Sequence, residues 1–462
     1  MQVMERYPSA SFAPPAEHKP KNILLDFLWR FLLVYFFLSD WVWLNELAVN
    51  PTRPIHPVFN AVFGSLARWT GHHLFHLTGP LAPNSFRDTQ YLYLVLLVLA
   101  VTSAVAALLW TAFGRKGHSA QTAYRLLRIW IRYTLAYMIL IYAMDKVFRL
   151  QFIAPTLQRL IEPYGDSSPM AMLWTYVGYS GFMTVFSGLA EVLGAVLLLW
   201  RRTAPLGALV CVVMMANVAL MDFCYDVSVK MLAAHFLAMS VFLLAHDADR
   251  LLRVLTFNSP APARDLEKDE LTVTNPSVRR WLPLVKALIV IYTLVPVTVR
   301  TYIQFRHSGP FAPHPPFYGL YQVRSLTVNG TPRPLLVTDG PVWRWLIVEH
   351  RAEATIKTMD NTLIVCKAQY HADAPDLQIQ GTAPGLSSSE SDLPGHGPSS
   401  SASDASPLSL TLSPSPSQHG EMLLTGTDGS DKISAVLDPV DPRSFTLVNR
   451  GYHWINATSF SR

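Results

Sequence analysis

One acidic side chain stands in the middle of a long apolar segment. Glu191 lies within the run 171–200, which holds no other charged residue. An ionisable group inside a lipid bilayer is costly, so it is a functional hypothesis by default. We expect Glu191 to carry a proton or to bind the headgroup of a redox cofactor. The structural alternative stays open, because Ser180, Thr184 and Gly188 precede it at four-residue spacing, which favours close helix packing.

A second group of polar side chains flanks the neighbouring apolar runs. It contains acids, bases and hydrogen-bonding groups: Asp145, Lys146, Arg149, Asp222, Tyr225, Asp226, Lys230 and His235. If the helices bundle, these side chains would ring one cavity near the outer membrane face. Asp145 and Arg149 are four residues apart, so they can also pair on one helix face.

Such a cavity would combine proton transfer with substrate binding. Side chains that can act as acid or base are expected to be catalytic, namely Glu191, Lys230, Asp226 and His235. The remaining groups are expected to bind a quinone carbonyl or an anionic substrate, namely Lys146, Arg149, Asp222 and Tyr225. The alternative is an interfacial ion-pair network that stabilises the bundle, and the sequence leaves both open.

Metal and thiol chemistry find little support in the sequence. His72 and His76 have the four-residue spacing of metal ligands on a helix. Two histidines leave a zinc shell incomplete, and no acidic or cysteine partner lies nearby in sequence, so we predict no metal site. The three cysteines form no CxxC pair, which argues against a disulfide framework and against a thiol relay.

The polar residues above are positioned by apolar runs. The chain is 50% hydrophobic and 15% charged, whereas ordinary soluble domains are about 25% charged. About seven runs are long enough to cross a bilayer, namely 23–44, 91–113, 129–149, 171–200, 204–222, 229–249 and 281–301. We therefore predict an α-helical membrane domain over 23–301 that follows a polar tail, 1–22, and is embedded in a lipid bilayer.

An amphipathic helix is expected over 58–77, between the first two runs. Its apolar residues share one helical face, namely Val58, Phe59, Val62, Phe63, Leu66 and Trp69. A helix of this kind lies in the membrane surface instead of crossing it.

The distribution of Lys and Arg predicts the orientation. With the N-terminus inside, the inner segments hold most basic residues, for example Lys19, Lys21, Arg201 and Arg202. This is the positive-inside pattern, and it puts the C-terminus outside. The net charge is +5, but the basic residues lie at the ends of apolar runs and form no single stripe. Nucleic acid is therefore not an expected partner.

The sequence pattern of the C-terminal third predicts a separate all-β domain. After a linker at 302–316, residues 317–462 contain short alternating segments separated by turn signals such as Asn329-Gly330. The expected strands are Tyr321–Val328, Trp343–Glu349, Ala354–Met359, Thr362–Tyr370, Leu377–Gln380, Glu421–Leu424, Lys432–Leu437 and Ser444–Val448. Together they favour a small antiparallel sandwich or barrel. The Ser/Pro-rich stretch 382–419 is expected to be a disordered insertion.

The stretch 125–253 contains sequence features of a known membrane family. They are Tyr164-Gly165-Asp166-Ser167-Ser168-Pro169-Met170, Phe186 through Gly194, the basic turn Trp200 through Ala208, and Tyr225 through Lys230. This stretch resembles the DoxX-like membrane proteins of bacteria. The longer chain is similar to an extended form of that family with a C-terminal extracytoplasmic domain, in which the closing segment Phe445–Asn456 also looks familiar.

The resemblance implies a four-helix membrane core in the bacterial inner membrane, with the β domain on the periplasmic or extracellular side. It also implies a subunit or partner in quinone-linked redox metabolism, because related DoxD-type subunits belong to thiosulfate:quinone oxidoreductase. The electron carrier would then be a bound quinone or a membrane redox partner protein. The alternatives are a non-catalytic scaffold that anchors the exported domain and a proton-coupled transporter, so whether the chain is an enzyme stays open.

Overall fold

The computed structural model describes most of the chain between residues 23 and 455. The described ranges are 23–45, 56–81, 87–114, 120–261, 276–336, 342–349, 353–370, 376–382, 407–414, 420–451, 453 and 455. The predicted N-terminal tail, 1–22, lies outside them. The chain divides into two compact units, Met1–Thr134 with Ala248–Trp281, and Leu135–Asp247 with Leu282–Arg462.

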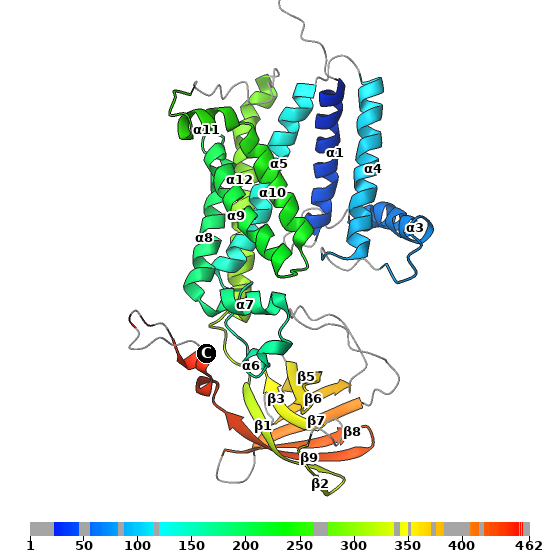
Figure 1. Cartoon of the computed structure of the whole chain (residues 1–462), viewed down its shortest axis with the longest axis vertical. Coiled ribbons are helices and arrows are strands. Elements are labelled where there is room, and N and C mark those ends of the chain that lie inside the picture. The colour runs from blue at the N-terminus through cyan, green and yellow to red at the C-terminus, as the bar shows by residue number, and fades with distance from the viewer. Residues whose placement is uncertain are drawn as a thin grey trace, which may run out of the picture. The chain divides into compact units, whose positions relative to one another are not determined.

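The first unit is helical. Two long helices, α1 (Ile23–Asn45) and α4 (Gln90–Phe113), run side by side (Figure 1). Between them in sequence, α2 (His56–Phe59), a π-helical segment (Asn60–Gly64) and α3 (Ser65–His73) form one helical stretch, followed by Leu74–Leu77 in non-helical conformation.

The expected amphipathic helix exists, but its apolar face is divided. Phe59 and Phe63 pack against the core around Val95 and Leu99 of α4, because the helical stretch lies against that helix. The remaining members of the face are exposed, namely Val58, Val62, Leu66 and Trp69. The stretch therefore presents apolar side chains both to its own unit and to its surroundings.

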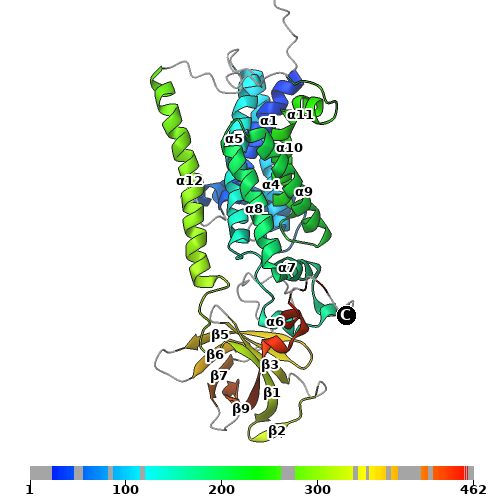
Figure 2. The same ribbon diagram turned by 90° about the vertical axis from the view of Figure 1, so that its left-hand side faces the viewer.

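The second unit contains the helices that carry most candidate residues. α5 (Ala120–Val147) begins in the first unit and ends in the second. It is followed by α6 (Leu157–Leu160), α7 (Pro169–Tyr179), α8 (Gly181–Leu199), α9 (Ala204–Cys224) and α10 (Lys230–Ala245). After α11 (Ala248–Leu255) of the first unit, α12 (Pro276–Ser308) lies along α5, with Tyr292 stacked on Tyr137 and Phe305 against Phe148 (Figure 2).

The expected single span 171–200 is wrong. The segment forms two helices, α7 and α8, and α7 lies crosswise to α8 (Figures 1 and 2). Ser180 takes an extended conformation between them. Its hydroxyl accepts a hydrogen bond from the Met183 amide at 3.2 Å. A helix cap satisfies amides that have no intrahelical partner, so a single serine starts a new helix inside a run that hydropathy treats as continuous.

Five described helices are long and apolar enough to cross a membrane. They are α4, α5, α8, α9 and the part Arg280–Ser308 of α12. α10 and α11 together would make a sixth, although they meet at a bend of 73°. The chain is thus compatible with a multi-pass membrane protein, and the expected number of about seven spans stays a prediction.

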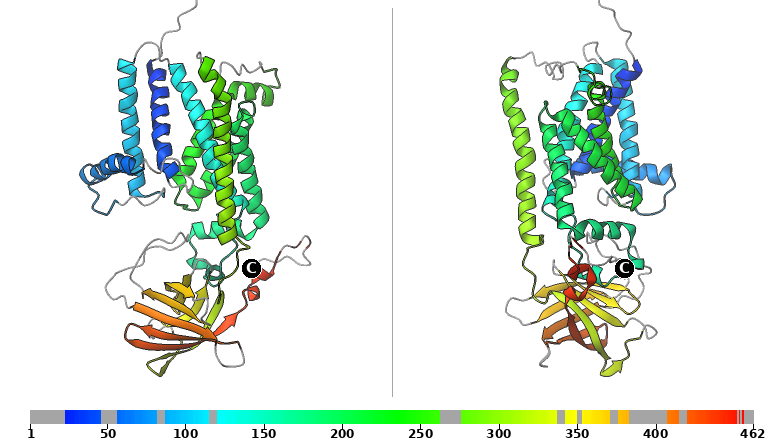
Figure 3. Two further views of the ribbon diagram at one scale, coloured as in Figure 1. Left: turned by 180° about the vertical axis from the view of Figure 1, so that it is seen from behind. Right: turned by 60° about the vertical axis from the view of Figure 1, so that its left-hand side comes forward.

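The C-terminal part forms one antiparallel barrel (Figure 3). Its strands are β1 (Gly319–Val328), β2 (Thr331–Arg333), β3 (Trp343–Val348), β4 (Glu353–Thr358), β5 (Leu363–Tyr370), β6 (Leu377–Thr382), β7 (Pro407–Pro414), β8 (Met422–Asp428) and β9 (Asp431–Val440). β3 to β9 pair in sequence order, and β9 pairs back with β1, which also pairs with β3. β2 extends the far end of β1 as a hairpin and stands outside this ring.

The interior of the barrel is filled by side chains. Alternate residues of β7, namely Leu408, Leu410 and Leu412, are buried, and they join a core of apolar residues from the other strands of the ring. Eight strands enclose a space that side chains can just fill. The barrel is therefore a packed domain, which agrees with the barrel alternative of the sequence prediction.

Three boundaries of this region differ from the expectation. Residues 407–414 form β7, a strand that pairs with β6 and β8. The prediction of a disordered insertion over 382–419 is therefore wrong for these residues. Residues 383–406 and 415–419 lie outside the described residues. Ser/Thr-rich composition hid the alternating leucines. The last expected strand, 444–448, is helical, because Asp441 caps a turn at Pro442–Ser444 that leads into Thr446–Asn449. α12 also continues through Ser308, into the expected linker.

The barrel binds the short α6 segment of its own unit. The Gln158 amide donates to the Glu349 carboxylate at 3.0 Å, and the Lys357 ammonium donates to the Ile161 carbonyl at 3.0 Å. Leu157 packs on Leu320 and Ile347 of the barrel wall. Polar and apolar contacts together therefore attach the connection between α5 and α7 to the barrel.

This attachment should depend on pH. Burial raises the pKa of Glu349 above its ordinary value of 4.5, so the docked form binds the proton more tightly than the free form. Docking should be strongest below the ordinary pKa and should weaken as pH rises through the raised pKa. In the full chain, hydrogen exchange at the Gln158 amide, corrected for its intrinsic rate, should therefore accelerate on passing from acidic to neutral solution.

The variant Glu349→Gln keeps an acceptor for this amide but cannot titrate, so it should abolish that acceleration. Glu421→Gln, whose parent carboxylate pairs with Arg324, is the matched control and should retain it. An unchanged pH profile in Glu349→Gln would contradict the assignment.

Candidate functional site

A buried ion pair joins α5 and α8. The Lys146 ammonium lies 2.5 Å from Oε1 of Glu191, and the side chains are 8% and 1% exposed. Lys146 belongs to the last turn of α5, and Glu191 lies in the middle of α8. The sequence analysis selected both residues separately, and the structure brings them into direct contact.

Glycines let the helices come close enough for this contact. A Cβ atom added at Gly188, one turn before Glu191, would lie 2.8 Å from the Val147 amide nitrogen and 2.9 Å from the Ala143 carbonyl. On α9, a Cβ at Gly207 would lie 2.8 Å from the backbone nitrogen of Leu198. α8 therefore touches the backbones of both neighbours, as the small-residue spacing predicts.

The pair balances the charge of two groups that are costly to bury alone. Taking one ion from water into an apolar interior costs several kcal/mol of solvation free energy. The attraction of a close opposite charge offsets about that much. The second oxygen of Glu191, Oε2, is buried and has no hydrogen-bond partner among the described residues. The site thus holds a charged donor, its acceptor and one further acceptor atom that is still available.

Arg149 and Asp145 do not pair with each other, contrary to the possibility raised by their spacing. α5 ends at Val147, and Arg149 takes a positive φ of 54°, which turns its guanidinium against Gly181. Asp145 lies 3.5 Å from Arg300 of α12. The helix ends two residues too early for the four-residue pairing, so a distant helix supplies the partner.

The residues of the α9–α10 turn divide into surface and interior groups. Asp226 pairs with Lys230 at 2.7 Å, its side chain is 83% exposed, and the Lys230 hydrogen bond lowers the pKa of its carboxyl. Tyr225 is also exposed. Asp222 and His235 are buried, and Nδ1 of His235 lies 2.6 Å from the Met231 carbonyl. The single cavity ringed by all these residues stays a prediction.

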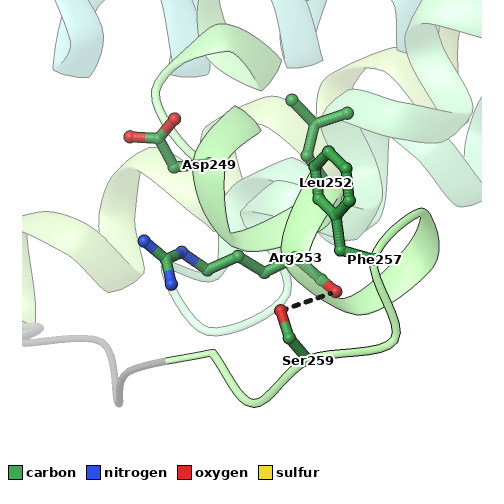
Figure 4. Close-up of a pocket in the computed structure, with 5 residues that line it drawn as sticks. All are labelled: Asp249, Leu252, Arg253, Phe257 and Ser259. Atoms are coloured by element: carbon green, nitrogen blue, oxygen red, sulfur yellow. Dashed lines mark hydrogen bonds between the residues drawn. The ribbon is translucent and has the colours of Figure 1, made fainter.

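A hollow of about 380 Å³ lies elsewhere, beside α11 (Figure 4). It is lined by Asp249, Leu252, Arg253, Phe257 and Ser259, and the Ser259 hydroxyl donates to the Arg253 carbonyl at 3.3 Å. None of the expected site residues lines it.

Two histidines of the α3 helix contact backbone carbonyl groups. Nδ1 of His72 lies 2.8 Å from the Leu77 carbonyl, and Nδ1 of His73 lies 3.0 Å from the Trp69 carbonyl. Within the described ranges, no cluster of three or more His, Cys, Asp or Glu side chains could hold a metal ion.

One buried contact was missed entirely. Asp40 of α1 accepts a hydrogen bond from the indole of Trp130 on α5 at 2.7 Å. The signal available in the sequence was Asp40 itself, an acid inside an apolar run, but 90 residues separate it from its partner. Spacing along the chain could not reveal that contact.

The fold and the ion pair define a class: a protein with several membrane-length helices, a buried charge pair between two of them and a C-terminal antiparallel β-barrel. A stretch of 139 residues is 30% identical to the uncharacterized protein YwoB of Bacillus subtilis (strain 168), and it covers 30% of this chain and 86% of YwoB. The chain therefore belongs to the family of YwoB. No family model matches the chain, and no solved structure matches it.

Replacing Gly188 should separate the helices. In Gly188→Ala the added methyl group meets backbone atoms of α5, and overpacking of this kind costs about 1–3 kcal/mol. The thermal midpoint in detergent should fall accordingly. Gly165→Ala is the control, because no atom lies within 4 Å of a Cβ added there, and its midpoint should be unchanged. Equal midpoints for the two variants would refute the close contact.

The ion pair should show strong coupling in a double-mutant cycle. Lys146→Met or Glu191→Gln alone leaves one buried charge without its partner, which costs about 3–5 kcal/mol. The double variant leaves no buried charge, so it should regain most of that stability. The midpoint of unfolding in detergent, measured for all four proteins, checks this. Additive losses would mean that the two side chains do not interact.

Proposed function

We propose that the chain is a multi-pass inner-membrane protein of the DoxX-like type that acts as a subunit or partner in quinone-linked redox metabolism. The observation that carries the proposal is the buried Lys146–Glu191 pair between two membrane-length helices. Ionisable groups in such positions are expensive, so they are associated with proton or ligand pathways.

The groups present fit the headgroup of a quinone or quinol. The Lys146 ammonium can donate to a carbonyl oxygen, and the free Oε2 of Glu191 can accept from a hydroxyl group. A bound quinone would supply a redox couple that takes up and releases protons with its electrons. The role of this chain would be to hold or pass a proton at Glu191 while Lys146 compensates its charge.

The proposed orientation puts the N-terminus in the cytoplasm and the barrel outside the membrane, on the periplasmic or extracellular face. The support is the excess of Lys and Arg in segments that would then be cytoplasmic. In this arrangement the exported barrel holds the α6 segment that follows the end of α5.

A second candidate is a non-catalytic scaffold that anchors the exported domain. One observation favours it: the barrel interior is filled by apolar side chains, so the domain is built as a rigid module whose outer surface is available to a partner. In that case the ion pair would serve only to join helices.

Quinone content and quinone reduction separate the two candidates. The protein should be purified from its native membrane in mild detergent, and bound quinone should be extracted and identified by mass spectrometry. Glu191→Gln should lower both the bound quinone and the rate of quinone reduction in membranes at least tenfold, because the proton-accepting carboxylate is lost.

Glu162→Gln is the matched control, since its parent carboxylate lies outside the long helices and pairs with Arg159. It should leave both quantities unchanged. If the purified parent protein carries no quinone, and Glu191→Gln changes only thermal stability, the scaffold function is correct.

A further inference from the structure

Another buried carboxyl group lies in the first unit, and the proposed function does not use it. Asp40 of α1 is 1% exposed. Its Oδ2 atom accepts the indole N–H of Trp130 at 2.7 Å. Trp130 is itself held by Phe37, whose ring centroid lies 4.7 Å away. The carboxyl group is therefore buried, and it contacts a neutral donor that is packed against another aromatic ring.

Asp40 differs from Glu191 in what compensates its charge. Glu191 has the Lys146 ammonium at 2.5 Å, so its ionised form is neutralised. Within the described ranges, no Lys, Arg or His side chain forms an ion pair with Asp40. Its ionisable neighbour is the Tyr35 phenol on the same helix, which is neutral at physiological pH. The hydroxyl of Thr134, one turn beyond Trp130, is a second neutral partner, because it contacts the Asp40 carboxyl group as well as the Trp130 carbonyl, the latter at 2.9 Å.

Enclosure without a cation has a definite consequence. An isolated carboxylate in an apolar interior is so costly that the group binds a proton instead. We propose that Asp40 is a proton-binding site of the helical domain, a carboxylic acid at neutral pH that is distinct from the Lys146–Glu191 pair. As an acid it keeps the hydrogen bond from Trp130 and gains a donor of its own.

The position of Asp40 suits proton exchange. It lies five residues before the last residue of α1, about 8 Å along the helix axis. The group is thus sheltered from water yet close to one end of the helix. The inference does not depend on quinone binding, because it rests on the surroundings of Asp40 alone.

Infrared spectroscopy of the whole protein tests the proposal directly. A protonated carboxyl group absorbs at higher frequency than the amide band and shifts in heavy water, whereas a carboxylate does not absorb there. At neutral pH the difference spectrum between the parent and Asp40→Asn should contain one carboxylic-acid band, and isotope-labelled aspartate should shift it. Glu191→Gln, the matched control, should retain that band. The absence of any such band in the difference spectrum would overturn the proposal.

A second variant covers the case in which Asp40→Asn fails to fold. Trp130→Phe keeps an aromatic ring but removes the indole donor. The carboxylic-acid band should then move to higher frequency, because a carbonyl that loses a hydrogen bond becomes stiffer. Trp110→Phe, which alters a tryptophan that faces Arg30, should leave the band in place. A band that is insensitive to Trp130→Phe would show that the acid belongs to another residue.

Discussion

The salt bridge between Lys146 and Glu191 constrains how α5 and α8 pack against each other. Two charges can remain in an apolar bundle only while they touch, because either one alone would lose several kcal/mol of solvation. At the same place α8 approaches the end of α5 more closely than a side chain at position 188 would allow, which Gly188 makes possible. The ion pair and the glycine therefore belong to one helix contact.

The same connection in the chain joins this pair to the barrel. After the last turn of α5, the chain passes through α6, which the barrel holds through Glu349, Lys357 and an apolar contact, and it returns to the bundle as α7 and α8. Lys146 and Glu191 thus lie at the two ends of a segment whose middle is attached to the β domain.

Two of the buried acids, Glu191 and Asp40, show how the surroundings of a carboxyl group decide its role. Glu191 faces a cation and can stay charged, whereas Asp40 faces the indole of Trp130, a neutral donor. A charged pair and a neutral acid differ in what they can exchange with a ligand. This difference arises from helix packing, since both residues are acids within apolar runs when the sequence is considered alone.

Helices and strands were predictable where the burial of apolar side chains alone determines the sequence pattern. The apolar runs at 91–113 and 204–222 are helices within two residues of their expected ends, and alternation located most barrel strands. The prediction was wrong where a local effect competed with composition. A capping serine divided 171–200, and a Ser/Thr-rich composition concealed the alternating leucines of β7.

The sequence by itself determined that the chain has membrane-length helices and a C-terminal β domain, because burial of apolar side chains imposes periods of 3.6 and 2 that are visible residue by residue. It also singled out Glu191, as the one charge in an apolar run, and Lys146, as one of the polar residues that flank such runs. Only the tertiary structure decided their partners: Lys146 for Glu191, Trp130 for Asp40 and Arg300 for Asp145. These partners lie 45 to 155 residues away, and contacts over such separations depend on how helices pack, which no local pattern records.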